Sequence, residues 1–297
     1  MILIFTAIFN RIRQIRSGAK QAWNLKVEAL KVMGFAFRRL NKMETSTDEP
    51  FTLGSILKKH RVRLDPNSGN PTPAQKRLSI SKYLASHFKD FNILRLHLFH
   101  SNKNPTLEKA PDSVLDCARY LSSQGLLLTI DPKRKIFCID PKREDGREYL
   151  NGEWLEELVY VAFREAGAEE SSYRQKILWG SPDKMSHFEV DVLARKSDVM
   201  VFSSCKAIRP EPEQGRSTEL RRFMSEALSW DHLFAAGKAK ILVVTTAEMV
   251  DRRTHAMRYA PLVEQARYLG EVLLGVEDLA WEKLCSVAGL LLDGKEP

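Results

Sequence analysis

The chain has 297 residues, of which 43% are hydrophobic, and its formal net charge is +8. This length and apolar content predict a folded protein with a full core and two domains rather than one, which excludes a disordered chain. Its four cysteines show no C-x-x-C pair or finger spacing, so the sequence favours neither a disulfide framework nor a structural zinc site, and a reducing, cytoplasmic setting is expected.

The positive charge is concentrated at the start of the chain. Residues 1–42 carry nine basic residues and one acid, which leaves the remainder formally neutral. Apolar residues recur there at helical spacing, so a basic amphipathic helical segment is expected over residues 1–45. A nucleic-acid arm, a helix on an acidic membrane and a helix packed on a partner protein all fit this pattern. The opening apolar run is too short to span a bilayer and lacks the flanks of a secretory signal, which disfavours a membrane partner.

A second region, residues 46–148, is expected to be mainly helical. Helical periodicity covers 74–88 and 112–125, and a hairpin with a basic tip follows over 126–140. A helix followed by such a hairpin is typical of a winged helix, although an exposed turn in a small α+β connector fits as well. The tip carries three cations that are candidates for phosphate contact, Lys133, Arg134 and Lys135.

The third region, residues 149–297, has the most specific pattern. Its expected elements are a helix over 151–167, strands over 173–179, 189–194 and 199–206, a helix over 216–236, a strand over 240–246, a helix over 254–269, a short strand near 271–276 and a terminal helix. The order α-β-β-β-α-β-α-β predicts an α/β domain in which helices enclose a mixed sheet.

Two charged residues lie within apolar strands of this region. Side chains alternate along a strand, so Asp191 shares a face with Glu189, and Lys206 shares a face with Ser204 on the following strand. Pairing of the two strands would bring Asp191 and Lys206 together. The pair is either a partly buried ion pair or part of a phosphodiester-cleaving site, in which carboxylates hold a divalent ion and the lysine stabilises the attacking water or the phosphate charge.

This arrangement resembles the PD-(D/E)XK restriction-like nucleases, whose α-β-β-β-α-β core carries Asp on its second strand and (D/E)-x-K on its third. It is most similar to the nuclease domain of CRISPR-associated effectors activated by cyclic oligoadenylate, which reads G-G-W-L-E on the first helix, E-(L/V/I)-D-V-L on the second strand and E-C-K on the third. The resemblance covers roughly residues 112–279. The matching residues are Gly152, Trp154, Leu155, Glu156, Glu189, Asp191, Val192, Leu193, Cys205 and Lys206.

The resemblance implies a metal-dependent endonuclease that uses Mg²⁺ or Mn²⁺, with DNA favoured over RNA, in a defence or mobile-element context. It implies Asp191 as the principal metal ligand, Glu156 and the backbone carbonyl of Cys205 as further ligands, and Lys206 as the catalytic lysine. His187 is a candidate phosphate contact or simply a surface histidine. Cutting both strands of a duplex takes two sites, which is compatible with a homodimer.

One departure from the family pattern lies on the third strand, where Ser204 replaces the glutamate. Some restriction endonucleases of this fold carry Ser-x-Lys and supply the glutamate from the following helix in an Arg-x-x-Glu pattern, which Arg216 and Glu219 match here. Glu219 is therefore the hypothesised replacement ligand and Glu226 a weaker candidate, although an acid in a first helical turn is also favoured by the helix dipole. The alternative function is a degenerate nuclease fold that binds nucleic acid or a protein without cutting.

A second departure is that residues 1–110 lack the strand-helix alternation of the family's sensor domain. Activation by a cyclic nucleotide is therefore not expected. The Cys205 thiol is expected to be a small buried group that points away from Asp191, and Trp154 is expected in the core.

Overall fold

The computed structural model describes residues 52–59, 62–69, 72–100, 107, 109–140, 142, 144–181, 184–208, 216–235, 237–251 and 253–297. The predicted basic segment 1–45 lies outside these residues.

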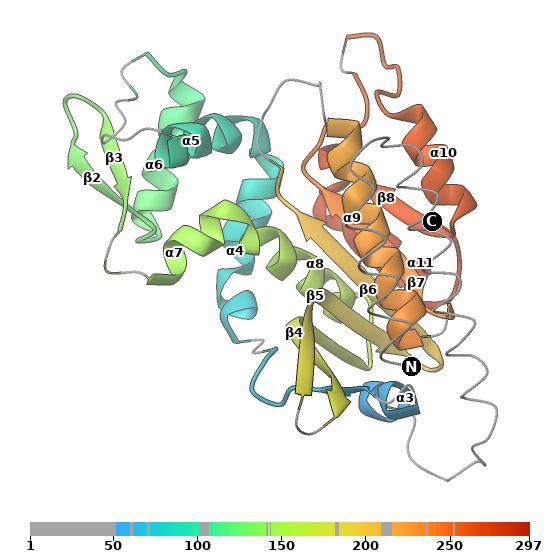
Figure 1. Ribbon diagram of the computed structural model, residues 1–297. Helices are drawn as coiled ribbons and strands as arrows, with labels where there is room; N and C mark the ends of the chain where they lie inside the picture. Colours follow the sequence, from blue (N-terminus) through green and yellow to red (C-terminus); the bar gives the residue numbers. More distant parts are fainter. Residues whose placement is uncertain are drawn as a thin grey trace, which may run out of the picture.

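A mixed sheet of six strands lies at the centre of the described part (Figure 1). Its spatial order is β1 (Val62–Leu64), β4 (Glu170–Ser181), β5 (Lys184–Lys196), β6 (Val199–Lys206), β7 (Lys240–Thr245) and β8 (Glu271–Leu274). The pairs from β1 to β6 are antiparallel, whereas β7 and β8 join in parallel. A separate two-stranded sheet pairs β2 (Leu127–Asp131) with β3 (Ile136–Ile139).

Helices precede, connect and follow these strands. They are α3 (Leu53–Lys59), α4 (Thr72–Ser86), α5 (Phe88–His100), α6 (Asp112–Ser123), α7 (Glu144–Glu148), α8 (Trp154–Glu165), α9 (Arg216–Trp230), α10 (Ala260–Tyr268) and α11 (Trp281–Leu292), with single-turn segments η2 (Tyr149–Glu153), η3 (Asp231–Ala235) and η4 (Val276–Asp278). None of the described helices is long and apolar enough to cross a membrane.

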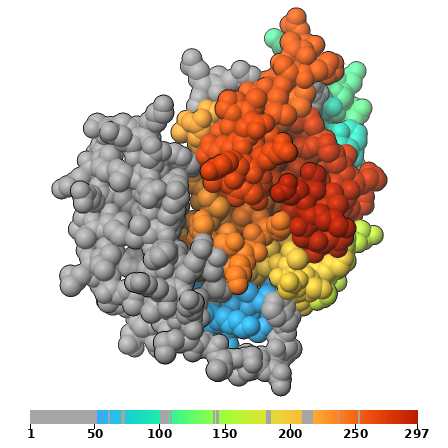
Figure 2. Space-filling model, turned by 90° about the vertical axis from the view of Figure 1, so that its right-hand side faces the viewer, coloured from blue at the N-terminus to red at the C-terminus, as the bar shows by residue number. Residues whose placement is uncertain are grey.

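Helices cover both faces of the central sheet. On one face α8 and α11 pack on β5 and β6, and on the other α9 packs on β6 and β7 while α10 packs on β8. The alternation along β6 explains this layering, because Val201 and Cys205 join the buried cluster under α8, whereas Met200 and Phe202 join the cluster under α9. The C-terminal elements, coloured orange to red, form much of the described surface on one side (Figure 2).

The helices that precede α8 share its core. Buried side chains from α4, α5, α6 and β3 belong to one cluster with those of α8. Trp154, at the start of α8, is fully buried and meets Phe91 of α5 edge to face, with ring centroids 5.9 Å apart. The predicted boundary between residues 148 and 149 therefore runs through a continuous core, and the division into domains stays a prediction.

The predicted elements from residue 151 onward are confirmed in type and order. The third helix is shorter than expected and begins at Ala260 instead of 254, because the Asp251 carboxylate accepts the N–H groups of Arg253 and Thr254 and holds a turn there. The helix of 112–125 and its hairpin are also present. The elements that were not predicted include the helices α3, α5 and α7 and the strand β1, which extends the main sheet.

Candidate functional site

Asp191 and Lys206 meet where β5 and β6 separate. The pairing of the two strands ends at Val192 and Ser203, and two residues further along β6 the N–H of Cys205 binds a side chain instead of a backbone carbonyl. It donates to Asp191 Oδ2 over 2.7 Å, and Lys206 Nζ lies 2.8 Å from the same oxygen. The strand pairing inferred from the sequence thus does bring the two charged groups together.

Ser204 occupies the face of β6 that carries Lys206. Its side chain is fully buried, and its Oγ lies 3.5 Å from Asp191 Oδ2, at the edge of hydrogen-bonding distance. The position at which the resembled family has a carboxylate therefore faces Asp191 with a neutral hydroxyl. Compared with the resembled family, the surroundings of Asp191 therefore lack the carboxylate of the third strand.

The Lys206 ammonium is held in its charged form. Burial acts to lower its pKa, but the charge of Asp191 and the hydrogen bond to it raise the pKa more, with a smaller contribution from Glu226, so that the net shift is upward. Arg95 of α5 fixes the backbone just beyond it by donating from Nη2 to the carbonyls of Ala207 and Ile208, over 3.1 and 3.0 Å. Lys206 is thus a fixed positive charge and not a base.

Glu156 and Glu157 are neighbours on α8 with different surroundings. Glu157 is fully buried and accepts hydrogen bonds from Arg77 Nε, at 3.2 Å, and Nη2. Burial, followed by the negative charge of Asp191, raises the pKa of Glu156 to about 8. Glu156 Oε2 is buried without a hydrogen-bond partner among the described residues. Glu156 is therefore the α8 acid whose charge interacts with that of Asp191, whereas Glu157 is held in an ion pair with Arg77.

The sequence did not indicate Arg174, which lies on β4 between the residues paired with Val190 and Val192 and is therefore level with Asp191. Its Nη1 lies 3.0 Å from Glu153 Oε1, and its charge acts to lower the pKa of Glu156. An arginine in a partly exposed strand position gives no sequence signal of its own, because only the register of β4 on β5 places it opposite Asp191.

The two acids proposed on α9 are placed differently. Glu219 lies in the first turn, partly exposed, with Oε1 4.0 Å from Arg222 Nη2. Glu226 is exposed two turns further on, and its charge helps to raise the pKa of Lys206. Between them Phe223 lies under Lys206, with Nζ 6.0 Å from the ring centroid. The electrostatic contribution of Glu226 to the pKa of Lys206 favours it over Glu219 as the helix acid that acts on the lysine.

Replacing each α9 acid with glutamine separates these assignments. If the centre cleaves phosphodiesters, as the sequence analysis expects, Glu226→Gln should lower the cleavage rate more than Glu219→Gln, whose effect should stay within about twofold because its contact with Arg222 is exposed and weak. Initial rates of nucleic-acid cleavage at fixed metal concentration measure both. A larger loss in Glu219→Gln would restore Glu219 as the replacement ligand.

The remaining candidates from the sequence are Cys205, His187 and the cations at the tip of the β2–β3 hairpin. The Cys205 side chain is buried in the cluster under α8, and burial raises the pKa of its thiol well above the usual value, as expected for an inert group. His187 is exposed on β5, opposite Leu178 of β4 and four residues from Asp191. The three cations of the β2–β3 tip are solvent-accessible, and the Asp131 carboxylate accepts the N–H groups of Lys133 and Arg134.

The residues present are compatible with a magnesium-type ion, although no group of three or more His, Cys, Asp or Glu residues in the described part forms a ready-made metal site. Mg²⁺ is commonly held by one or two carboxylates and completes its shell with water and substrate phosphate. Asp191 and the unpartnered Oε2 of Glu156 meet that requirement. A cation between them would also relieve the repulsion that raises the pKa of Glu156.

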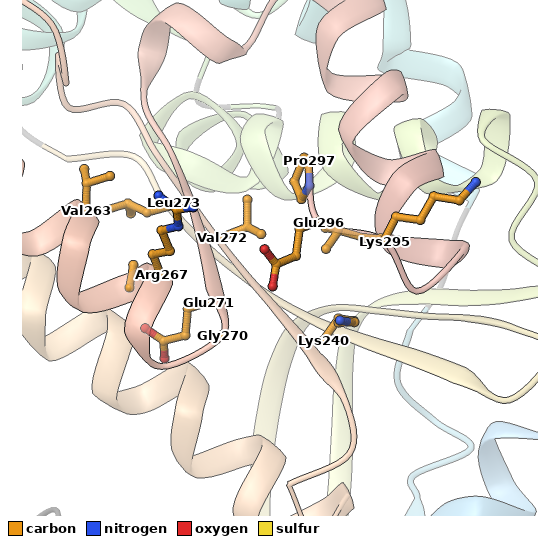
Figure 3. Close-up of a pocket in the computed structure, with 12 residues that line it drawn as sticks. Lys240, Val263, Arg267, Gly270, Glu271, Val272, Leu273, Lys295, Glu296 and Pro297 are labelled. Carbon is orange, nitrogen blue, oxygen red and sulfur yellow. The ribbon is translucent and has the colours of Figure 1, made fainter.

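A pocket of about 250 Å³ lies at the other end of the parallel strands (Figure 3). It is lined by residues of β8, α10, the start of β7 and the last residues of the chain. Lys240 of the pocket pairs with Val201, whereas Lys206 pairs with Thr245 at the opposite end of the same ladder. The pocket is therefore separate from the carboxylate–lysine centre.

Glu271, which lines this pocket, carries a buried carboxyl group whose ionisation should affect the stability of the fold. It is 4% exposed, and neither carboxylate oxygen has a partner in the described part of the chain. Burial and then the charge of Asp231 raise its pKa to about 8. The folded state therefore favours the protonated form, and the stability it contributes is present below the unfolded-state pKa and is lost as the pH rises through about 8.

We expect Glu271→Gln to match the wild type at about pH 5 and to exceed it by roughly 2–4 kcal/mol at about pH 9. Denaturant unfolding at both pH values measures this, with the exposed Glu264→Gln as the matched control. A variant that is less stable than wild type at both pH values would show that the Glu271 carboxylate is needed in its ionised form.

Comparison with known proteins gives similarity at the level of the fold. No protein-family model and no curated protein matches the chain. Solved structures with the same fold include protein VC1899 from Vibrio cholerae, with a TM-score of 0.60, 14% identity and coverage of 86% of this chain and 65% of that one. They also include Can2 from Sulfobacillus thermosulfidooxidans in complex with cyclic tetra-adenylate, with a TM-score of 0.52, 14% identity and coverage of 83% and 62%. The chain thus spans less than two thirds of either protein.

Proposed function

We propose that this protein is a metal-dependent nuclease with a restriction-like, PD-(D/E)XK core, acting on DNA in preference to RNA in a defence context. The observation that carries the proposal is the convergence of Lys206 Nζ and the Cys205 N–H on one oxygen of Asp191. Beside them lies the partly desolvated Glu156 with its unpartnered oxygen. The fold shared with Can2 supports the proposal.

Each residue of the site has a separate task in phosphodiester hydrolysis. The Cys205 N–H and Lys206 orient the Asp191 carboxylate, which together with Glu156 would hold the ion. A divalent ion bound there would polarise the scissile phosphate and lower the pKa of a water molecule. Lys206 keeps its proton, so its ammonium stabilises the charge on the phosphate or orients the attacking water.

The second candidate function is nucleic-acid binding without cleavage. It is favoured by Ser204, which supplies no carboxylate next to Asp191. The exposed basic tip of the β2–β3 hairpin would provide phosphate contacts under either function. We propose that this hairpin acts as the wing of a winged helix, which also accounts for its position beyond α6 (Figure 1).

The test incubates the purified full chain with plasmid, single-stranded DNA and single-stranded RNA, with Mn²⁺, Mg²⁺ or EDTA. The nuclease proposal predicts cutting that requires the metal and is absent from Asp191→Asn. Salt-sensitive gel shifts without cutting under any condition would favour the binding function instead.

A further inference from the structure

Arg174 has an unusual backbone for a residue within a strand. Its φ is 51°, in the left-handed region that side chains other than glycine rarely adopt. It interrupts the ladder of β4 on β5 between the pairs Tyr173–Val192 and Gln175–Val190. Strained conformations of this kind cost about 1–3 kcal/mol and concentrate at functional sites. The strained residue lies directly opposite Asp191, and a functional role there would explain why the strain is retained.

The Arg174 side chain is surrounded by carboxylates. Nη1 contacts Glu153 at 3.0 Å and Glu148 at 3.4 Å, and Nε lies 3.5 Å from Glu189. The Arg174 side chain is 38% exposed, so solvent and substrate reach it, whereas that of Glu153 is only 11% exposed. The contact with Glu153 is thus the firm one, because ion pairs with exposed acids contribute little.

Glu153 is itself anchored from the other side. Its Oε2 lies 3.6 Å from Nη2 of Arg77, a buried residue of α4. Arg77 is fixed in turn by the buried Glu157 and by Asp145, whose Oδ2 is 2.5 Å from Nη1. A chain of contacts therefore leads from the core to the guanidinium at the site and holds it in place before any substrate arrives.

We propose that Arg174 is a phosphate-binding residue of the nuclease site, positioned by Glu153 to contact the nucleic-acid backbone beside Lys206. The proposal rests on the proposed function, because it takes the Asp191 centre as the place where the phosphodiester lies. The contacts of Arg174 engage Nη1 and Nε, and a guanidinium also carries the N–H donors of Nη2, which suit phosphate oxygens.

The competing account is that Arg174 only neutralises the surrounding acids and keeps them from repelling one another. In that case, removing the Arg174 side chain would change the stability of the fold and the affinity for metal but would not change the binding of phosphate. The dependence of affinity on salt separates the two accounts, because each phosphate contact contributes about 0.9 on duplex DNA, and about 0.7 on single-stranded DNA, to the magnitude of the slope of log K against log salt concentration.

The experiment measures the binding of labelled single-stranded and duplex DNA to the full chain in Ca²⁺ over a range of salt concentrations, together with cleavage in Mn²⁺. The variants are Arg174→Ala, Arg174→Lys and Arg174→Gly. Arg164→Ala removes the same charge from the exposed end of α8 and is the matched control. Arg174→Gly relieves the backbone strain, so its melting temperature should equal or exceed that of the wild type.

We expect Arg174→Ala and Arg174→Gly to lower the magnitude of the salt slope by about 0.9 on duplex DNA and about 0.7 on single-stranded DNA, and to lower the cleavage rate on the order of 10²-fold. Arg174→Lys should keep most of the slope, and Arg164→Ala should keep both quantities. An unchanged slope in Arg174→Ala, or faster cleavage with tighter metal binding, would overturn the proposal.

These outcomes also distinguish a failure of the proposed function. Wild-type protein that binds DNA without cutting, with the slope still reduced in Arg174→Ala, would refute the nuclease and keep the phosphate contact. The absence of any salt-dependent binding by the wild type would overturn both.

Discussion

Lys206→Met should lower the rate of metal-dependent cleavage by about 10²–10³-fold, while the protein stays folded. The lysine is the positive charge next to Asp191, at 2.8 Å, and its raised pKa keeps that charge across the neutral range. Methionine preserves the length and the packing of the side chain on Phe223 but removes the ammonium. Asp191 still receives the Cys205 N–H, which limits the loss of stability.

The matched control for this variant is Lys196→Met. Lys196 lies at the far end of β5 and pairs with Asp293 at 2.8 Å, the same distance as in the site, but both side chains are 38% exposed. Its removal should leave cleavage unchanged. Equal rates for wild type and Lys206→Met, at equal melting temperature, would contradict the role assigned to the lysine.

Arg77→Met should destabilise the protein by about 3–5 kcal/mol, because it leaves a buried carboxylate without its partner. Glu157 is fully buried and is held by two nitrogens of Arg77. Even with this partner present, burial raises the pKa of Glu157 to about 7. Without Arg77, either the Glu157 carboxyl group is protonated in the folded state at neutral pH, or its ionised form is buried without a partner and lowers the stability of the fold. Denaturant unfolding at neutral pH measures the difference.

The pH dependence of this loss follows from the raised pKa of Glu157. Its protonated form needs no counter-charge, so the cost of Arg77→Met should shrink as the pH falls well below 7. Arg119→Met is the control, since the pair of Arg119 with Asp116 is largely exposed, and its effect should stay within about 0.5 kcal/mol. A loss of stability for Arg77→Met as small as that of the control would show that removing the partner of Glu157 does not destabilise the fold.

The sequence predicted the elements that surround Asp191 and Lys206 because their local patterns are strong. Apolar alternation marked β5 and β6, and strand periodicity alone put the two charged residues on facing arms. The helical period of α8 placed Trp154 inward, which the structure confirms. Short-range rules of this kind depend only on neighbouring residues, so they can be applied without knowledge of the fold.

The parts of the site that were not predicted depend on long-range pairing. Arg174 reaches the site through the register of β4 on β5, and Glu153 through its shared contact with Arg77, a residue far away in the sequence. Family resemblance alone indicates Glu156, whereas in the structure its neighbour Glu157 is distinguished from it by an ion pair with Arg77 of α4. Such pairings leave no periodic signal in the chain.

The most direct test of the nuclease centre is the rate of DNA cleavage as Mn²⁺ is titrated into wild-type protein and into Asp191→Asn. Asparagine retains the shape of the side chain but removes the charge that would hold the ion beside Lys206. We predict saturable, Mn²⁺-dependent cleavage by the wild type and none above background by the variant. Equal cleavage by the two proteins would show that hydrolysis takes place at another site and would contradict the assignment of Asp191.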